Sequence, residues 1–339
     1  MKGIICEEIE SFLMSEMLPE PVLTTGHAIV GIRRIGICGT DYHAYKGNQP
    51  FFQYPRILGH ELSGVIESIA ANEEGFAVGD QVSVIPYMHC GDCVACRRGK
   101  TNCCTDMKVL GVHIDGGMRE RISVPLSHLI KTNGLTLDEA AMVEPLAIGA
   151  HAVRRAEISA TDTVLVIGSG PIGLGVMAFA KYAGARVIAM DINEERLAFC
   201  RSWAKVDQTL NALDSDARER LSAMTNGDFP VAVFDATGNP ASMMKAFDFV
   251  AHGGKLIYVG LFKGDIAFSD PEFHKRELTL MGSRNATISD FYHVLDVIGE
   301  YRFDINQYIT HRCSFDGMID VFEDWLKPES KVIKAIVEL

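Results

Sequence analysis

The stretch ICGTDYHAY, residues 37–45, places a thiol, a hydroxyl, a carboxyl and an imidazole within six positions. Thiolates and neutral imidazoles bind metals, and a hydroxyl near an imidazole can pass on a proton. Further groups of these kinds follow: His60 and Glu61 in LGHELSG, and Glu144 in MVEPLAIGAH. Cys38, His60 and Glu144 would make an open zinc site of the catalytic type, with water or substrate as the fourth ligand. Spacing alone does not bring them together, and each also fits a plain structural role: a buried thiol, a core histidine and a helix-surface acid.

A second set of sulfur ligands lies in residues 90–104, CGDCVACRRGKTNCC. The spacing C-x2-C-x2-C-x7-C gives four thiolates in one lobe, which suits a tetrahedral zinc with no open position for chemistry. The four candidates are Cys90, Cys93, Cys96 and Cys104. An iron–sulfur cluster is the rival, because cysteine triplets at this spacing also hold clusters, and Cys103 is an alternative to Cys104. Reduced cysteines without a metal are the plain alternative, and a reducing cytosol argues against disulfides.

The third motif with chemical meaning is GSGPIG, residues 168–173, which matches G-x-G-x-x-G between a predicted strand and a predicted helix. Glycines there allow a tight turn and a close approach of backbone N–H groups to a pyrophosphate. The cofactor-binding candidates in this loop are Gly168, Gly170, Pro171, Ile172 and Gly173. The next predicted strand ends at Asp191, whose carboxylate would accept hydrogen bonds from the adenosine ribose of NAD and repel the 2′-phosphate of NADP. We therefore expect NAD, although Arg196 is close enough in sequence to reach a phosphate. A glycine-rich turn that binds nothing is the alternative.

The elements around this loop predict an α/β domain. Six apolar runs are predicted strands: 163–167, 186–190, 208–211, 231–235, 255–259 and 278–281. Helical periodicity lies between most of them, at 172–183, 194–202, 217–225 and 240–251. Alternation of this kind is typical of βαβ units, and six strands make a full dinucleotide-binding sheet. We therefore predict a doubly wound parallel sheet of the Rossmann type.

The preceding part of the chain predicts a β-rich domain. Short β-like runs alternate with turns there, as at 28–31, 62–69 and 81–85. Thr136 and Glu139 fit a capping box at the start of a helix, and the strand-like run 331–337 is expected to return to this first domain. Two domains are the ordinary expectation for 339 residues. We place them at 1–145, with the cysteine lobe at about 88–106, and at 146–283, with 284–339 returning to the first.

Composition narrows the possible partners. The chain has 44 acidic and 32 basic residues, and its formal charge of −12 disfavours a surface for nucleic acid or anionic membrane. The longest uncharged run, 163–180, contains a proline and four glycines, so we do not expect a membrane span. These features indicate a cytoplasmic globular protein.

Several segments together resemble the zinc-dependent medium-chain alcohol and polyol dehydrogenases. In chain order they are GICGTDYHAYKG, YPRILGHELSGVI, the four-cysteine lobe, VEPLAIGAHAV and VLVIGSGPIGLG. The resemblance covers essentially the whole chain. It implies a GroES-like catalytic domain, a Rossmann domain, and an active site in the cleft between them. It also implies two zinc ions, one structural on the four-cysteine lobe and one catalytic on Cys38, His60 and Glu144. A glutamate as third ligand is similar to the sorbitol and sugar-acid branch, since many alcohol dehydrogenases of the family have a cysteine there.

The resemblance also assigns roles to neighbouring residues. Thr40 would contact the alcohol at the zinc, and His43 would lead its proton to solvent by way of the cofactor ribose. Glu61 corresponds to an acid that approaches the metal transiently. Zinc lowers the pKa of a bound alcohol, and the substrate then passes hydride to the nicotinamide.

The substrate is the feature that the sequence determines least. Phe51 and Phe52 are candidate walls of the pocket, although paired aromatics are more often core or interface residues. Arg284 and Asn285 follow the sixth strand, and a guanidinium there would suit a substrate carboxylate, with a protein acid as the alternative partner. We expect a small molecule: a sugar acid such as a hexonate, with a neutral polyol or simple alcohol as the alternative. A non-catalytic NAD(P)H-binding protein is the alternative from another class. The resemblance implies a homodimer or homotetramer.

Overall fold

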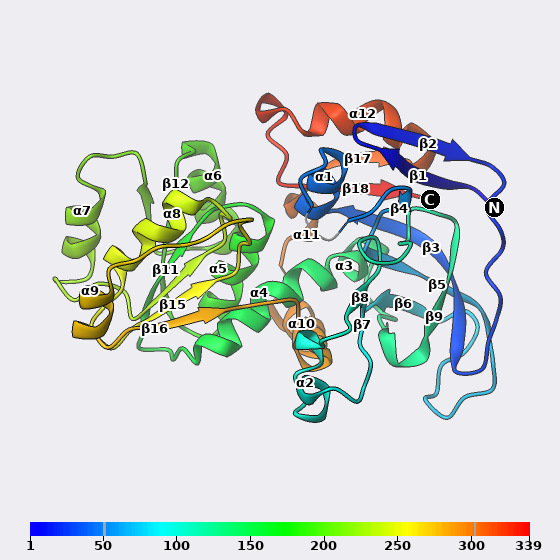
Figure 1. The fold of residues 1–339 in the computed structure, drawn as a ribbon, viewed down its shortest axis with the longest axis horizontal. Coiled ribbons are helices and arrows are strands. Elements are labelled where there is room, and N and C mark those ends of the chain that lie inside the picture. The colour runs from blue at the N-terminus through cyan, green and yellow to red at the C-terminus, as the bar shows by residue number, and fades with distance from the viewer. Residues whose placement is uncertain (50–51, 302) are drawn as a thin grey trace. The chain divides into compact units, whose positions relative to one another are not determined.

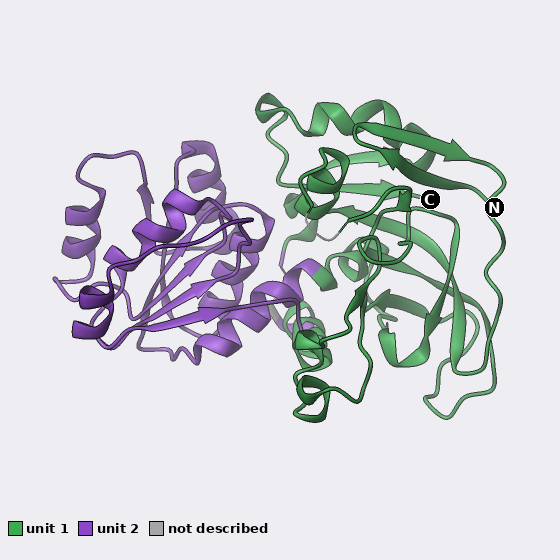
Figure 2. Cartoon of the chain, viewed as in Figure 1, with its two compact units in different colours: residues 1–144, 287–298, 304–339 green, residues 145–286, 299–303 purple. Residues whose placement is uncertain are grey.

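The computed structural model describes residues 1–49, 52–301 and 303–339, and the chain forms two compact units (Figure 2). Unit 1 comprises Met1–Glu144, Thr287–Ile298 and Asp304–Leu339. Unit 2 comprises Pro145–Ala286 and Gly299–Phe303. Both chain ends therefore belong to unit 1, and the short return of Gly299–Phe303 to unit 2 is a feature that the sequence did not indicate.

Unit 1 is built on a seven-stranded, largely antiparallel sheet of order β10-β6-β5-β3-β18-β17, with β9 also paired to β3 (Figure 1). Its strands are β3 (His27–Ile37), β5 (Glu61–Ile69), β6 (Gln81–Val84), β9 (Arg121–Pro125), β10 (Leu129–Lys131), β17 (Ile309–Ser314) and β18 (Lys334–Glu338). Two small sheets accompany it: β1 (Gly3–Glu8), β2 (Ser11–Ser15) and β4 (Arg56–Ile57), and β7 (Tyr87–Met88) with β8 (Lys108–Val109). The predicted β-rich fold of this part is confirmed.

The helices of unit 1 are short. They are α1 (Gly39–Tyr45), α2 (Val94–Arg97), α3 (Leu137–Ala141), α11 (Ile305–Tyr308) and α12 (Met318–Trp325), together with most of α10 (Ile288–Tyr301). The main apolar core joins alternate residues of the central strands, such as Val30 and Ile32 of β3, to Phe322 of α12. Ile37, the last residue of β3, belongs to the same core, so the candidate metal ligands begin beside packed side chains.

The C-terminal strand β18 lies in the main sheet of unit 1. This strand runs antiparallel to β3, with Ala335 opposite Ile37 and Val337 opposite Ile35, and parallel to β17. The strand β17 was not predicted, because its sequence ITHRCS alternates polar residues without a strong apolar face.

Unit 2 contains the predicted doubly wound sheet. Six parallel strands follow the order β13-β12-β11-β14-β15-β16. They are β11 (Thr163–Ile167), β12 (Arg186–Asp191), β13 (Gln208–Asn211), β14 (Ala232–Asp235), β15 (Lys255–Tyr258) and β16 (Thr279–Gly282). The helices are α5 (Pro171–Tyr182), α6 (Glu194–Phe199), α7 (Ala217–Met224), α8 (Pro240–Lys245) and α9 (Asp270–Lys275), together with most of α4 (Val143–Ala156). The strand order reverses between β11 and β14, which is where open α/β sheets bind ligands.

The capping box at Thr136 is confirmed, and the helix that it begins, α3, is short. Thr136 accepts from the Glu139 N–H at 3.1 Å, and the Glu139 carboxylate accepts from the Thr136 N–H at 2.7 Å. The helix α3 ends at Ala141 and a new helix, α4, begins at Val143. Pro145 explains the break, because it has no N–H for the carbonyl of Ala141 and its ring crowds that carbonyl.

No helix in the described part of the chain combines the length and the apolar character needed to cross a membrane.

Candidate metal and cofactor sites

Cys38 and His60 meet because β3 and β5 are antiparallel neighbours. The register pairs Gly36 with Glu61, so the end of β3 lies against the start of β5. Cys38 directly follows β3 and caps α1, where its N–H donates to Asp41 Oδ2 at 2.8 Å. The donor atoms of Cys38, His60 and Glu61 all lie within 4.8 Å of one another. A thiolate, an imidazole and a carboxylate are thereby gathered where β3 ends and β5 begins.

The surroundings of the His60 imidazole are negatively charged and therefore favour a positive charge at this position. It is buried, and among the described residues its Nδ1 has no hydrogen-bond partner, with Asp41 Oδ1 at 3.8 Å. Burial lowers the pKa of His60, but the charges of Asp41 and Cys38 outweigh it and raise this pKa well above its ordinary value. A site that favours a protonated imidazole also favours a metal cation, so the donor set fits zinc.

Glu61 forms a buried ion pair with Lys334 of β18. The Lys334 Nζ lies 2.6 and 2.7 Å from the two carboxylate oxygens and donates to the Ile37 carbonyl at 3.1 Å. The exposed fractions of the two residues are 0% and 1%. Gly36 makes room for this pair, because a Cβ at that position would lie 2.1 Å from Glu61 Oε2.

Glu144 lies outside the group formed by Cys38, His60 and Glu61, although it is buried in the same unit. Its Oε1 accepts a hydrogen bond from the Tyr87 hydroxyl. Burial raises the pKa of Glu144 to about 7, and the charge of His60 opposes this rise. Of the three expected ligands, the structure therefore gathers Cys38 and His60, together with Glu61. Glu144 is outside this group, but the charges of His60 and Glu61 act on its carboxyl.

The two residues of the expected proton path, Thr40 and His43, lie on α1, three positions apart and so on neighbouring points of the helix surface. Thr40 is half-buried and His43 is exposed. Phe51 lies outside the described residues. Phe52 packs edge-on against Tyr54 with ring centroids 4.8 Å apart.

The four-cysteine lobe brings its expected ligands together. The sulfurs of Cys90, Cys93, Cys96 and Cys104 all lie within 4.8 Å of one another. The Cys93–Cys96 and Cys90–Cys104 separations are both 3.5 Å, close to the roughly 3.8 Å edge of a zinc–sulfur tetrahedron. Backbone N–H groups of Cys93 and Cys96 donate to the sulfurs of Cys90 and Cys93. Cys103 is exposed and is not part of the group, so Cys104 is the better fourth ligand.

The glycine loop of unit 2 has the geometry that its sequence requires. Gly168 has φ +96°, and a Cβ on Gly173 would lie 1.8 Å from the Gly168 carbonyl oxygen. Gly170 caps α5, and Pro171 is its first residue, where a missing N–H costs nothing. The loop thus leaves the first backbone N–H groups of a twelve-residue helix for an anionic ligand.

Asp191 and Arg196 lie beside this loop. Asp191 ends β12, and its carboxylate accepts from the N–H groups of Ser169 at 2.6 Å and Asn193 at 2.9 Å. The Arg196 guanidinium lies next to Gly170, at 3.9 Å from where a Cβ would stand. The donor set and the open loop fit a dinucleotide with its ribose at Asp191 and its phosphates at the helix start.

Arg284 and Asn285 follow β16 at its carboxyl end, in unit 2. Arg284 is exposed. Asn285 has φ +52°, which asparagine tolerates better than most residues, and among the described residues its buried Nδ2 has no hydrogen-bond partner.

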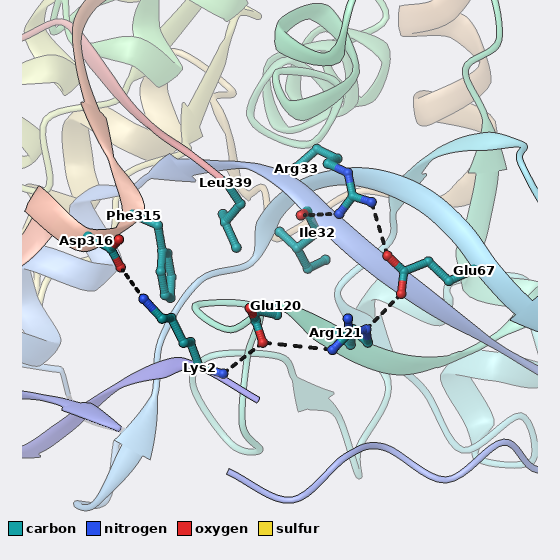
Figure 3. Close-up of a pocket in the computed structure, with 9 residues that line it drawn as sticks. All are labelled: Lys2, Ile32, Arg33, Glu67, Glu120, Arg121, Phe315, Asp316 and Leu339. Carbon is teal, nitrogen blue, oxygen red and sulfur yellow. Dashed lines mark hydrogen bonds and ion pairs between the residues drawn. The ribbon is translucent and has the colours of Figure 1, made fainter. Parts of the chain in front are cut away.

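A cavity of about 380 Å³ in unit 1 involves none of the described candidate residues (Figure 3). Its charged walls pair with one another: Lys2 with Asp316 at 3.2 Å, and Arg121 with Glu67 at 2.8 Å. Because the charged residues that line this cavity pair with one another, the cavity is not a candidate active site.

Three site residues were missed by the sequence analysis as contributors. Asp41 stands within the opening motif, so its proximity to Cys38 was a usable signal. Lys334 carries a weaker signal, a lone lysine inside the apolar run IKAIV. Nothing local marks Tyr87.

Comparisons with known proteins agree with this geometry. Residues 24–134 match the family model for the alcohol dehydrogenase GroES-like domain, and residues 171–300 match that for zinc-binding dehydrogenases. The chain is 42% identical to L-galactonate-5-dehydrogenase of Escherichia coli K12, over 99% of this chain and 98% of that protein. It is 29% identical to sorbitol dehydrogenase of Bacillus subtilis 168, over 95% and 93%.

A solved structure shares the whole fold. The crystal structure of the alcohol dehydrogenase RspB from E. coli CFT073, complexed with NADH, matches with a TM-score of 0.91 at 29% identity, covering 100% of this chain and 99% of that one. The two matched models fall on unit 1 and mainly on unit 2, and the 42% relative spans both units. This chain therefore belongs to the zinc-type, medium-chain alcohol and polyol dehydrogenase family, with a GroES-like and a Rossmann domain, and is an oxidoreductase.

Proposed function

We propose that this enzyme oxidises a secondary hydroxyl of a sugar acid, such as a hexonate, to the ketone and transfers the hydride to NAD. The observation that carries the proposal is the group of half-buried Cys38 with buried His60 and Glu61, in a chain 42% identical to an L-galactonate-5-dehydrogenase; Glu144 is buried in the same unit. In the reaction the substrate carbon loses a hydride to the nicotinamide and its hydroxyl loses a proton to solvent.

Cys38 and His60 would hold the catalytic zinc, with Glu144 as the third ligand, as the family resemblance implies. A bound zinc would supply Lewis acidity that lowers the pKa of the substrate hydroxyl. Glu61 is kept in the ion pair with Lys334, which favours Glu144 over Glu61 as the permanent ligand. Cys90, Cys93, Cys96 and Cys104 would hold a second, structural zinc.

The chain's own groups then handle the proton. The half-buried hydroxyl of Thr40 can accept a hydrogen bond from the substrate hydroxyl and donate one onward. His43 is exposed on the same helix, and its imidazole can accept a proton on one ring nitrogen and release one from the other, so it is suited to deliver the proton to water. Removal of either group should lower kcat more than it changes KM.

NAD is the proposed acceptor because Asp191 places a carboxylate at the end of β12, where it disfavours a 2′-phosphate. Arg196 is the counter-argument, and it is proposed to contact the pyrophosphate at Gly170 instead. The ratio of kcat/KM for NAD to that for NADP measures this preference. A ratio below one would contradict it.

Arg284 is proposed to bind the substrate carboxylate, and the test compares two substrates that differ only there. We expect Arg284→Ala to lower kcat/KM for a hexonate by about 10- to 100-fold, the usual cost of a charge-assisted hydrogen bond, and to leave that for the matching hexitol nearly unchanged. Equal losses on both would refute the role of Arg284. A wild-type enzyme that prefers the hexitol would instead support the alternative, a dehydrogenase of neutral polyols like the sorbitol dehydrogenase relative.

We propose that the enzyme is a cytoplasmic homodimer or homotetramer that acts on a small molecule. Light scattering of the purified protein measures the oligomeric state directly.

A further inference from the structure

Tyr87 connects the small β7–β8 sheet of unit 1 with the helix α10. It lies in β7, opposite Val109 of β8, and is 4% exposed. Its ring packs edge-on against the fully buried Phe291, with ring centroids 6.2 Å apart. Its carbonyl accepts a hydrogen bond from His128 Nε2 at 3.2 Å. Strand pairing, ring packing and this backbone contact together fix where the Tyr87 hydroxyl can be.

That hydroxyl donates to Glu144 Oε1. Within the described part of the chain, no other group donates a hydrogen bond to Glu144, so Oε2 is not engaged. An ionised carboxylate has room for several donors or for a metal on its second oxygen. The hydrogen bond from Tyr87 therefore selects one orientation of the Glu144 side chain without using up its ligand capacity.

Glu61 presents the opposite arrangement. Both of its oxygens face the Lys334 ammonium, at 2.6 and 2.7 Å. The two buried carboxylates thus differ in how readily they can bind a metal. Glu61 is neutralised by the Lys334 ammonium, whereas Glu144 accepts a single hydrogen bond from the uncharged Tyr87 hydroxyl. A carboxylate with a neutral donor retains the negative charge that attracts a cation.

We infer that Tyr87 is a positioning residue that holds Glu144 by one oxygen and presents the other to the catalytic metal. The inference rests on the proposed function, because it requires a metal at Cys38, His60 and Glu144. Hydrogen-bond partners of metal ligands typically contribute 10- to 100-fold to metal affinity, because they fix the ligand's orientation before the metal arrives. Tyr87 does this from outside the ligand set, with its position determined by β7, Phe291 and His128.

The test is a zinc titration of the purified full chain against a chromophoric chelator, with Cys38→Ser used to identify which binding step belongs to the Cys38 site. We expect Tyr87→Phe to weaken that step by about 10- to 100-fold and to leave the four-cysteine step unchanged. Tyr258→Phe is the matched control: it removes a tyrosine hydroxyl that donates to the Met243 carbonyl at 2.6 Å in unit 2. We expect the control to leave both steps unchanged.

A double-mutant cycle separates positioning from a general structural effect. With Glu144→Gln already in place, Tyr87→Phe should cause little further loss of zinc affinity, because its partner is no longer a ligand of the same kind. An equal further loss would overturn the inference. If Tyr87→Phe does not fold, Phe291→Leu serves instead, since it keeps the hydroxyl but loosens the ring, and a several-fold weaker zinc step is expected.

The failure of the inference is distinguishable from that of the proposed function. A wild-type chain without any zinc step that depends on Cys38 would refute the metal centre itself. A wild-type chain with that step, and a Tyr87→Phe variant that binds zinc within about twofold of wild type, would overturn the role of Tyr87 alone.

Discussion

Replacement of Lys334 by methionine should destabilise unit 1 strongly, because it leaves Glu61 buried without its cation. The pair has N–O distances of 2.6 and 2.7 Å, and the exposed fractions of the two side chains are 1% and 0%. Removing one partner of a buried ion pair costs about 3–5 kcal/mol, because the remaining charge keeps its desolvation cost without its counter-charge. For a domain of this size, that corresponds to a fall in Tm of roughly 6–20 °C.

A matched exposed pair sets the scale for comparison. Lys46 and Glu10 lie 2.6 Å apart, but their side chains are 40% and 52% exposed. Because solvent screens an exposed pair, it contributes only about 0.2–1 kcal/mol to the free energy of unfolding. Lys46→Met should therefore lower Tm by less than about 4 °C. The two variants remove the same charge at the same distance and differ mainly in burial.

The chain offers a clean optical assay for unit 1. It has two tryptophans, Trp325 in unit 1 and Trp203 in unit 2, so a Trp203→Phe background makes the fluorescence melt report unit 1. Adding Glu61→Met to Lys334→Met should recover most of the loss, because no unpaired charge then remains. A Lys334→Met variant that melts within error of Lys46→Met would refute the claim that the ion pair is buried and desolvated.

Two further perturbations concern residues that are not themselves metal ligands. Gly173→Ala should abolish NADH binding in a fluorescence titration, because the new Cβ would lie 1.8 Å from the Gly168 carbonyl oxygen; retained binding would contradict the loop geometry. Burial, with the charges of His89 and His27, lowers the pKa of His128 to about 4. In the unfolded chain the histidine pKa is near 6.5, so between about pH 4 and 6.5 the unfolded chain binds the proton more readily than the folded one. The contribution of neutral His128 to the free energy of unfolding is therefore full above about pH 6.5 and is lost as the pH falls to about 4. In melts across this range, His128→Gln should show a shallower loss than wild type, and parallel slopes would contradict the assignment.

The doubly wound sheet could be predicted because its signals are local. Buried parallel strands are continuous apolar runs, as in TVLVI before Gly168, and the glycines that follow mark a turn of known geometry. The boundaries of most strands in unit 2 therefore fall within a residue or two of their predicted places. The helix break at Met142 also has a local cause, Pro145, although the prediction did not use it.

The metal site could not be assembled from spacing, because its geometry comes from non-local pairing. Cys38 and His60 meet only through the register of β3 with β5, which pairs Gly36 with Glu61. Sequence spacing carries no information about that register, so the assembly rested on family resemblance. The partner of Glu61 was hidden for the same reason: Lys334 becomes a neighbour only when β18 pairs with β3.

The role of Tyr87 was not predictable at all from its surroundings in the chain. It lies three residues before Cys90, so its position in the sequence suggests a role in the cysteine lobe. Only the fold brings its hydroxyl to Glu144, 57 positions away. Sequence patterns thus locate ligands of common types, whereas the groups that orient those ligands emerge from tertiary structure.

The most direct test of the central claim is the rate of NADH formation from NAD with a hexonate as substrate, measured on zinc-loaded wild type and on Cys38→Ser. The proposed function predicts turnover of the hexonate by wild type, faster than that of the matching hexitol, and loss of nearly all activity in Cys38→Ser with the fold and the four-cysteine zinc intact. Equal turnover by Cys38→Ser, or a wild-type enzyme that oxidises the hexitol but not the hexonate, would contradict it.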